Sequence, residues 1–277
     1  MKVVVLGSKG MLGTDLMRVA AQQGLDVTGF DLPGFDITDA GQVAEAVKGA
    51  DTIVNCAAYT NVEQAESESA LAHKVNGDAV GQLGSIAKEI GAQVLHISTD
   101  FVFDGSSDTP YVETDEPKPI SEYGKSKLAG EELLIESGCD HCIMRIEWTY
   151  GSAGNNFVSK IVSLAQKDTS LRVIDDQVGS PTATTEVAKV ICELLGKRPT
   201  GLYHFASAGF VSRFGMAKFI FDTLGMSVEL GRCKSSDYKT AAQRPLNSRF
   251  DCGKIAGVLD GPIESWEEML ERFLRQL

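Results

Sequence analysis

The chain has 277 residues and is 43% apolar, and its 26 basic and 38 acidic residues give a formal charge of −12. This length and apolar content are ample for a large core, either in one α/β domain or in a domain with a smaller lobe. The acidic balance argues against general binding to nucleic acid or to anionic membranes, and no apolar run is long enough to span a membrane.

A glycine-rich turn follows the first predicted strand. Residues 2–6 (KVVVL) are an apolar, β-branched run of strand length, and the apolar spacing after them predicts a helix over 12–23. Glycine permits a tight reversal and close approach of a ligand, and the start of a helix favours an anion. The pattern predicts a site for a dinucleotide diphosphate, with an ordinary strand–helix turn as the alternative. The residues assigned to it are Gly7, Gly10, Met11, Leu12 and Gly13.

The second predicted strand, 26–30, ends at Asp31, whose carboxylate is placed to accept hydrogen bonds from the adenosine ribose. That position favours NADH. Lys9, inside the glycine turn, favours NADPH because a cation there could meet a 2′-phosphate. The two signals conflict, so the predicted cofactor is NADPH or NADH. Asp36 and Ile37 suit the edge and face of an adenine, and capping of the next helix explains Asp36 equally well.

The first half of the chain alternates strands and helices with short turns between them. Such alternation predicts a Rossmann-like α/β fold: a doubly wound parallel sheet with ligands beyond the carboxyl ends of its strands. Ala57, Ala58 and Tyr59 follow the third strand, where small residues would let a cofactor lie against the backbone; simple packing under a loop is the equal alternative. The predicted strands are 2–6, 26–30, 51–55, 93–98 and 141–147, and the helices are 12–23, 39–48, 64–89 and 122–137.

After about residue 150 the alternation becomes irregular, which predicts a smaller C-terminal α/β lobe that closes over the edge of the sheet. The expected division is a dinucleotide-binding domain over 1–150 and a mainly substrate-binding lobe over 151–277, with the segment near 173–205 a candidate to rejoin the first domain. The predicted strands here are 171–174 and 202–205, and the helices are 155–166, 185–195, 213–224 and 263–276.

Tyr123 and Lys127 lie four residues apart on a predicted helix and therefore share a face. A phenol ordinarily has a pKa of about 10, and a nearby ammonium is expected to lower that pKa. The pair can act as a general acid in carbonyl reduction, and Lys127 could also hold the nicotinamide ribose. A hydroxyl from Thr99, at the end of the fourth strand, would hydrogen-bond the carbonyl oxygen as charge develops there.

Seven stretches distributed over nearly the full length form a more specific pattern than the glycine turn alone. They are GSKGMLG (7–13), NCAAYTNVEQAE (55–66), STDFVFDG (98–105), YGKSKLAGE (123–131), GNNF (154–157), DQVGSPT (176–182) and QRPLNSR (243–249). In these stretches the chain resembles the extended short-chain dehydrogenase/reductases, and within them the dTDP-4-dehydrorhamnose reductase family.

The resemblance implies roles for individual residues. Thr99, Tyr123 and Lys127 match the catalytic trio of the family, and the glycine turn, Asp31, Asp36-Ile37 and residues 57–59 match its cofactor contacts, as do Tyr123 and Lys127. Core packing is the alternative for Trp148, and anchoring of a loop is the alternative for Arg244. The implied substrate contacts are Thr99, Asp100, Tyr123, Trp148, Asn156 and Arg244.

Three features of the sequence depart from the family pattern. Phe101 stands where a tyrosine is usual, a minor change. Some members share a magnesium ion between carboxylates of two subunits; here those positions hold Asp15 and Thr185, with Glu186 one place off, so neither that metal nor that dimer is predicted. Glu147 replaces a neutral residue before Trp148, and a carboxylate near the sugar could alter the choice of substrate.

The resemblance implies NAD(P)H-dependent reduction of the 4-keto group of dTDP-4-dehydro-β-L-rhamnose to dTDP-L-rhamnose. The alternatives are another nucleotide-linked 4-keto sugar, or a non-catalytic regulatory subunit similar to the β subunit of methionine adenosyltransferase. The expected partner is the nucleotide-sugar substrate, with no nucleic acid or membrane, and the expected state is a monomer or homodimer. Six scattered cysteines, without disulfide or metal spacing, predict a reducing, cytoplasmic compartment.

Overall fold

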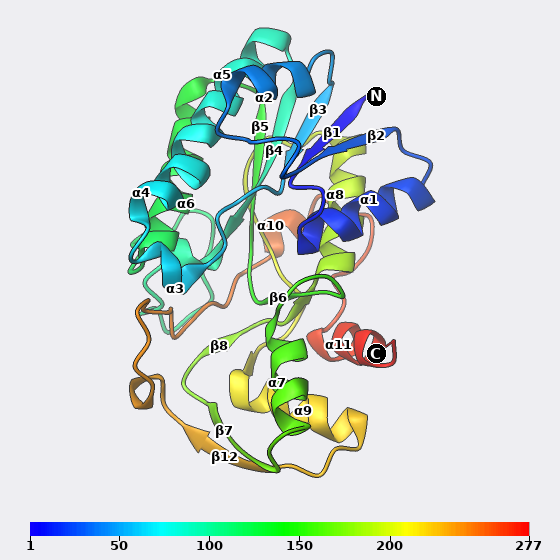
Figure 1. The fold of residues 1–277 in the computed structure, drawn as a ribbon. Coiled ribbons are helices and arrows are strands. Elements are labelled where there is room, and N and C mark those ends of the chain that lie inside the picture. Colours follow the sequence, from blue (N-terminus) through cyan, green and yellow to red (C-terminus); the bar gives the residue numbers. More distant parts are fainter. Residues whose placement is uncertain (277) are drawn as a thin grey trace.

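Six parallel strands form the central sheet of the computed structural model, which describes residues 1–276 (Figure 1). The strands are β1 (Val3–Leu6), β2 (Val27–Phe30), β3 (Thr52–Asn55), β4 (Gln93–Thr99), β5 (His141–Ile146) and β10 (Gly201–Phe205). Their order across the sheet is β10-β5-β4-β3-β1-β2. Every residue of β1 and β3 is buried, as expected for strands covered on both faces.

Helices cover both faces of this sheet (Figure 1). One face carries α1 (Met11–Gln22), α8 (Thr184–Lys197) and the short α10 (Gly253–Ala256), and the other carries α2 (Ala40–Ala46), α5 (Ala79–Ile90) and α6 (Glu122–Ser137). Leu16 and Ile191 pack in the core of the first face, and Leu83 and Leu134 in that of the second. The prediction of a Rossmann-like, doubly wound sheet is confirmed.

The single helix predicted over 64–89 is wrong in its first half. The chain forms α3 (Val62–Ala65), a turn, α4 (Ser69–His73) and then a π-helical turn, Lys74–Asp78, that runs into α5. Asn76, buried in the π turn, accepts a 2.7 Å hydrogen bond from the backbone N–H of Tyr59 and donates one of 2.9 Å to the Ser126 hydroxyl on α6. The wider turn lets one amide brace two segments, which regular helical spacing in a sequence does not indicate.

A small lobe lies below the sheet in Figure 1. It consists of α7 (Phe157–Ala165), β7 (Ser170–Ile174), α9 (Arg213–Leu224), β12 (Glu229–Cys233) and α11 (Trp266–Leu274). Phe214, Met216 and Trp266 are buried in its core. The helices predicted in this part of the chain are confirmed to within a few residues, whereas β12, which pairs in parallel with β7, has no counterpart among the predicted strands.

Four strands of two residues each form the seam between the sheet and the small lobe: β6 (Thr149–Tyr150) pairs with β9 (Thr182–Ala183), and β8 (Val178–Gly179) with β11 (Val211–Ser212). Strands this short carry no alternating pattern, so none was predictable. Between the seam strands the chain returns to the sheet, where α8 packs against α1 and β10 extends the sheet beyond β5. In the part of the chain that the structure describes, no helix has both the length and the apolar character needed to cross a bilayer.

Candidate active site

A cleft of about 710 Å³ opens at the carboxyl ends of β1, β2, β3 and β4, where doubly wound sheets take their ligands. The seam and the small lobe contribute Thr149 and Asn156 to its wall. Tyr59, Trp148 and Arg244, which were also predicted to contact ligands, are not among the lining residues. The predicted site residues that line it are Gly7, Gly10, Met11, Leu12, Gly13, Asp31, Asp36, Ile37, Ala57, Ala58, Thr99, Asp100, Tyr123, Lys127 and Asn156.

The glycine turn leaves room that only glycine provides. Gly7 has a φ of +79°, and a Cβ there would lie 2.5 Å from the backbone nitrogen of Ala57. A Cβ on Gly13 would lie 2.0 Å from the carbonyl oxygen of Gly7. The turn is therefore held close to both α1 and the loop after β3, with the start of α1 facing the cleft. These features fit the diphosphate of a dinucleotide, whose charge the helix N-terminus favours.

Asp31 both borders the cleft and braces the glycine turn. Its carboxylate accepts hydrogen bonds of 2.7 Å from the backbone N–H groups of Lys9 and Leu32. The Lys9 ammonium, which is exposed, has one contact of 3.3 Å to the Leu32 carbonyl oxygen. The carboxylate and the ammonium thus lie at the same end of the cleft, where they would meet the adenosine ribose or a phosphate on it.

Of the residues predicted to contact the adenine or to lie along the cofactor, all except Tyr59 line the cleft. Ile37 is buried, while the Asp36 carboxylate accepts a 2.9 Å hydrogen bond from the backbone N–H of Thr38. Ala57 lines the cleft, and its N–H donates to the Asn55 side chain at 3.1 Å. Tyr59 turns away, because its hydroxyl donates a 2.8 Å hydrogen bond to Glu68. In this structure the phenol of Tyr59 is therefore not part of the cleft wall.

Tyr123 enters the cleft from the first turn of α6. Ser121 caps this helix by accepting a 3.2 Å hydrogen bond from the Gly124 N–H. A Cβ on Gly124 would lie 2.1 Å from the carbonyl oxygen of Phe101, so this glycine lets α6 approach the segment after β4. The ring of Phe101 packs edge-on against Tyr123 with centroids 5.4 Å apart. These contacts hold the phenol at the ends of the strands.

The expected lowering of the Tyr123 pKa is not found. Burial raises the pKa of Tyr123 to about 12, the negative charge of Asp100 adds to the rise, and the Thr99 hydroxyl partly offsets it. The Lys127 ammonium, which is held against β4, is not among the groups that set this pKa. The phenol is consequently protonated at neutral pH, as a proton donor in a reduction must be.

Lys127 is buried, and its ammonium donates a 2.7 Å hydrogen bond to the carbonyl oxygen of Ile97. The ring nitrogen Nε2 of His96 lies 3.3 Å from the same ammonium. Burial lowers the pKa of Lys127 to about 8, and the nearby Glu131 partly offsets that effect. Burial and the Lys127 charge together hold the pKa of His96 well below its usual range, which leaves the imidazole neutral.

Thr99 and Asp100 form a short chain of hydrogen bonds at the end of β4. The Thr99 hydroxyl donates to the Asp100 carboxylate at 3.0 Å and accepts from the backbone N–H of Phe101 at 3.2 Å. Ser248, from the segment near the C-terminus, donates a 2.5 Å hydrogen bond to the other oxygen of Asp100. Burial raises the pKa of Asp100, although both hydroxyl donors lower it. Ser248 lies within the matched stretch QRPLNSR, but no feature of that stretch singles it out.

A buried ion pair that sequence reasoning missed supports this end of the sheet. Glu131 on α6 and Arg145 on β5 are each about 3% exposed and form a two-point contact, with distances of 2.8 Å and 2.5 Å. The Ser98 hydroxyl also donates to Glu131. The ion pair ties α6, which carries Tyr123, to β5, and the Ser98 contact ties it to β4, which carries Thr99.

Trp148, Glu147 and Arg213 cluster beside the cleft. Trp148 has a φ of +45°, a strained value for a bulky residue, and the Arg213 guanidinium carbon lies 3.4 Å from its ring centroid. The Glu147 carboxylate accepts a 2.9 Å hydrogen bond from the Ser180 N–H, while its other oxygen is buried without a partner. Burial and the charge of Asp100 hold the pKa of Glu147 well above its usual range, opposed by Arg213.

Arg244 and the remaining predicted substrate contact, Asn156, are already engaged with the protein. The Arg244 guanidinium lies 2.5 Å from the Glu63 carboxylate, and Glu63 also accepts a 2.8 Å hydrogen bond from the Ala241 N–H. This ion pair joins the loop that precedes Asn247 to α3. Asn156 caps α7 and donates a 2.8 Å hydrogen bond to the Gly151 carbonyl oxygen.

Asp15, at one position of the family's shared magnesium, and Glu186, one place from the other, are bound internally. Asp15 accepts a 2.6 Å hydrogen bond from the Thr184 hydroxyl and pairs with Arg18 at 3.0 Å. Glu186 pairs with Arg272 at 2.9 Å. Within residues 1–276, no group of three or more His, Cys, Asp or Glu side chains is arranged to hold a metal ion.

Comparison with known proteins places this geometry in context. The family model described as the RmlD substrate binding domain matches residues 1–277. The dTDP-4-dehydrorhamnose reductase of Salmonella typhimurium is 37% identical over 100% of this chain and 98% of its own length, and that of Sinorhizobium fredii is 33% identical over 99% and 97%. The crystal structure of the Bacillus anthracis dTDP-4-dehydrorhamnose reductase in complex with NADP has a TM-score of 0.95 at 35% identity, covering 100% of this chain and 99% of that one.

Proposed function

The chain belongs to the RmlD substrate binding domain family, and from this premise we propose that it reduces the 4-keto group of dTDP-4-dehydro-β-L-rhamnose to give dTDP-L-rhamnose. The electron donor is NADPH or NADH, in keeping with the NADP complex of the Bacillus anthracis relative. The observation that carries the proposal is that Thr99, Tyr123 and Lys127 line the same cleft as the glycine turn. A phenolic proton donor and a turn that can hold a cofactor diphosphate lie together at the carboxyl ends of the strands, as a nicotinamide-dependent reductase requires.

The reaction adds a hydride to C4 of the sugar and a proton to the C4 oxygen. When bound, the reduced nicotinamide cofactor supplies the hydride. Tyr123 gives its phenolic proton to the oxygen, and its high pKa in the free protein ensures that the proton is present at neutral pH. The phenolate left on Tyr123 regains a proton from solvent, which completes the balance.

Two neighbours assist this proton transfer. The Thr99 hydroxyl is placed to hydrogen-bond the C4 oxygen as negative charge develops, provided that it turns from Asp100 toward the substrate. The Lys127 ammonium is fixed against the Ile97 carbonyl oxygen, where it would meet the nicotinamide ribose. The residues that would hold the cofactor diphosphate are those of the glycine turn.

A turnover assay tests this function directly. Purified protein is mixed with NADPH or NADH, with and without dTDP-4-dehydrorhamnose, and oxidation of the cofactor is followed by absorbance. Oxidation that requires the keto sugar, with dTDP-L-rhamnose as the product, supports the proposal. Absence of oxidation with either cofactor would exclude it and leave reduction of another nucleotide-linked 4-keto sugar, or a binding function, as the alternatives.

The choice among nucleotide-linked 4-keto sugars is a separate question, because Glu147 places a carboxyl group next to Trp148. A panel of such sugars, compared by kcat/KM, ranks the candidates. We also propose a cytoplasmic location, since all six cysteines are free thiols. A monomer or homodimer is expected, which sedimentation of the purified protein distinguishes.

A further inference from the structure

Arg213 stands at the seam in a fixed position. It is the first residue of α9, directly after β11, and its backbone N–H donates a 3.2 Å hydrogen bond to the Gln177 carbonyl oxygen. Ser212 caps the helix by accepting a 3.1 Å hydrogen bond from the Gly215 N–H. Because β11 pairs with β8, the strand and the helix cap together set where the Arg213 side chain begins.

The Arg213 guanidinium is stacked between aromatic rings at the border of the cleft. Its central carbon lies 3.4 Å from the ring centroid of Trp148 and 5.1 Å from that of Phe157. Thr149 follows Trp148 and Asn156 precedes Phe157, and both of these neighbours line the cleft. The stack therefore adjoins the wall of the cleft on the side of the small lobe. Stacking fixes the plane of the guanidinium and leaves its edge free for hydrogen bonds.

The donors of this guanidinium are unused by the protein. Across residues 1–276, no side-chain hydrogen bond and no ion pair within 4.0 Å involves the Arg213 side chain. Arg145, Arg232 and Arg244 each have a carboxylate partner by the same measure. Burial lowers the pKa of Arg213 to about 10, and the charges of Asp100 and Glu147 oppose that fall, so the group remains charged at neutral pH.

A second cation lies near the first. The charge of Arg244 is close enough to lower the pKa of Arg213 further, and Arg244 lies in the loop fastened to α3. A charged guanidinium that is stacked in place and has unused donors predicts an anion with several acceptor oxygens. The glycine turn accounts for the cofactor's diphosphate. In a nucleotide-linked 4-keto sugar the diphosphate is on C1, across the ring from the C4 that faces Tyr123.

We propose that Arg213 binds the diphosphate of the nucleotide-sugar substrate, beside Arg244 and on the face of Trp148. The inference rests on the proposed function for the identity of the substrate. Arg213 lies at the seam, and the sequence did not single it out. Its proposed role is to recognise the charged half of that substrate. Arg213 acts in binding and does not touch the reacting carbon.

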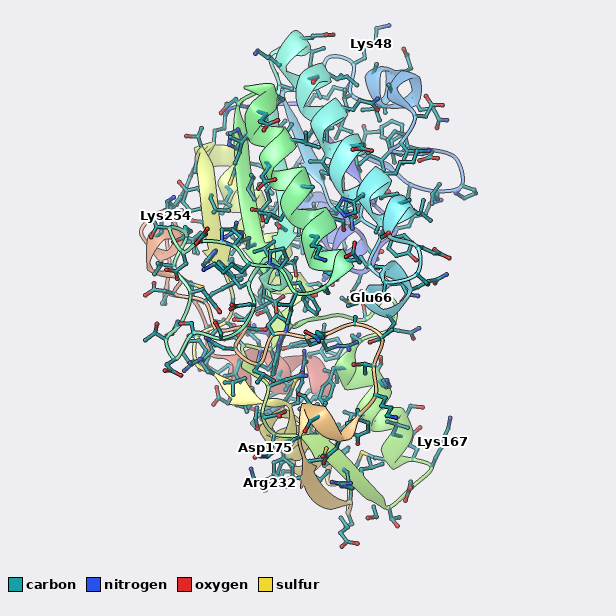
Figure 2. All side chains as sticks on the ribbon, turned by 90° about the vertical axis from the view of Figure 1, so that its left-hand side faces the viewer. Lys48, Glu66, Lys167, Asp175, Arg232 and Lys254 are labelled. Atoms are coloured by element: carbon teal, nitrogen blue, oxygen red, sulfur yellow. The ribbon has the colours of Figure 1, made fainter. Side chains whose placement is uncertain are left out.

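Calorimetric titration of the full chain with dTDP and dTMP tests this assignment without turnover. In R213M the Kd for dTDP is expected to rise at least tenfold, because a charge-assisted two-point contact is lost, while the Kd for dTMP rises less than threefold. R232M is the matched control: Arg232 also stacks on an aromatic ring, that of Phe214, but its guanidinium is paired with Asp175 in the small lobe (Figure 2). Its dTDP affinity should stay within twofold of the parent protein.

R213K provides a second variant that keeps the charge and the alkyl stem but lacks the planar fork. We expect its Kd for dTDP to rise about fivefold, and this variant carries the test if R213M does not fold by circular dichroism. A dTDP affinity within twofold of the parent in the folded variant would overturn the proposal, as would equal losses for dTDP and dTMP, which would mean that Arg213 acts through Trp148. Failure of the parent protein to turn over a keto sugar, with the dTDP effect intact, would refute the proposed reaction and leave the diphosphate site standing.

Discussion

The ammonium nitrogen of Lys127 lies 2.7 Å from the carbonyl oxygen of Ile97, so the cation that α6 brings to the active site is anchored on β4. Although the two residues share a helix face, burial and the charge of Asp100 raise the pKa of the Tyr123 phenol in the free protein. The lysine, the more deeply buried of the two, has its own pKa lowered to about 8. Burial therefore disfavours the charged forms of both Tyr123 and Lys127 before any ligand binds.

The stability of the protein should rise with pH between about 8 and 10.5 because of Lys127. In that window the unfolded chain binds the lysine proton and the folded chain does not, so increasing pH favours the folded state. Relative to K127M, the parent should gain roughly 3 kcal/mol in its free energy of unfolding across the window. Urea titrations at several pH values measure it, and the opposite effect of Tyr123 between pH 10 and about 12 cancels because both proteins contain this residue. K167M, at an exposed lysine of the small lobe (Figure 2), should follow the parent; a parallel K127M curve would contradict the prediction.

Removal of the Tyr123 hydroxyl should abolish most of the activity while leaving the fold intact. In Y123F, kcat is expected to fall by about 10²–10⁴-fold, the range typical of a lost general acid, with cofactor affinity changed by less than about threefold. Steady-state kinetics and cofactor titration measure the two quantities. Y238F, which removes the hydroxyl of a half-exposed tyrosine outside the cleft, is the control. Full activity in Y123F would remove the phenol from the mechanism.

Alanine at Gly13 should disrupt the diphosphate cradle. The added methyl group would lie 2.0 Å from the Gly7 carbonyl oxygen, so the turn or α1 must shift. We expect cofactor affinity to fall more than tenfold and the free energy of unfolding to drop by about 1–3 kcal/mol. G196A, in α8 with nothing within 4 Å of the new Cβ, should instead stabilise the protein by about 0.5–1 kcal/mol. The idea fails if G13A binds cofactor normally.

Lys9 and Asp31 should shift cofactor preference in opposite directions. K9A is expected to weaken NADPH about tenfold relative to NADH, because only NADPH carries the phosphate that the ammonium would meet. D31A should weaken NADH more than NADPH, and it should also reduce affinity for both, since Asp31 braces the turn through the Lys9 N–H. The ratio of kcat/KM for the two cofactors is the readout, with D26A at the other end of β2 as control. Equal losses in both variants would refute this division of roles.

Truncation of Glu131 should be among the most destabilising single changes in the sheet domain. E131A leaves the Arg145 guanidinium buried without its carboxylate partner, which costs about 3–5 kcal/mol. E132A, one residue along α6 and exposed, should change stability by less than about 0.5 kcal/mol. Urea unfolding monitored by circular dichroism compares the two, and similar midpoints for both variants would show that the ion pair does not support the fold.

Much of the fold could be predicted because its periodic elements carry strong local signals. The run KVVVL followed by the glycine turn predicted β1 and the start of α1, and the helix expected over 213–224 coincides with α9. The π turn around Asn76 and the two-residue strands of the seam could not be predicted, because each depends on contacts with distant segments. The local sequence does not indicate such long-range contacts.

The chemistry of the site was less predictable than its location. Spacing placed Tyr123 and Lys127 on one face, yet the direction of each pKa depends on burial, which follows from packing against β4. Arg213 follows Ser212 in a stretch that looks like an ordinary helix start. Its stacking on Trp148 depends on the strained backbone at that tryptophan and on the pairing of β11 with β8.

The position of β10 has a consequence for biosynthesis. During translation the free edge of β5 is synthesised well before residues 201–205, and the ribosome must release the seam and part of the small lobe before that edge is paired. Until then the nascent polypeptide presents an unpaired strand, the kind of surface on which chains associate wrongly. A messenger truncated shortly before β10 should yield an aggregating, chaperone-dependent product, whereas extension past residue 205 should relieve it.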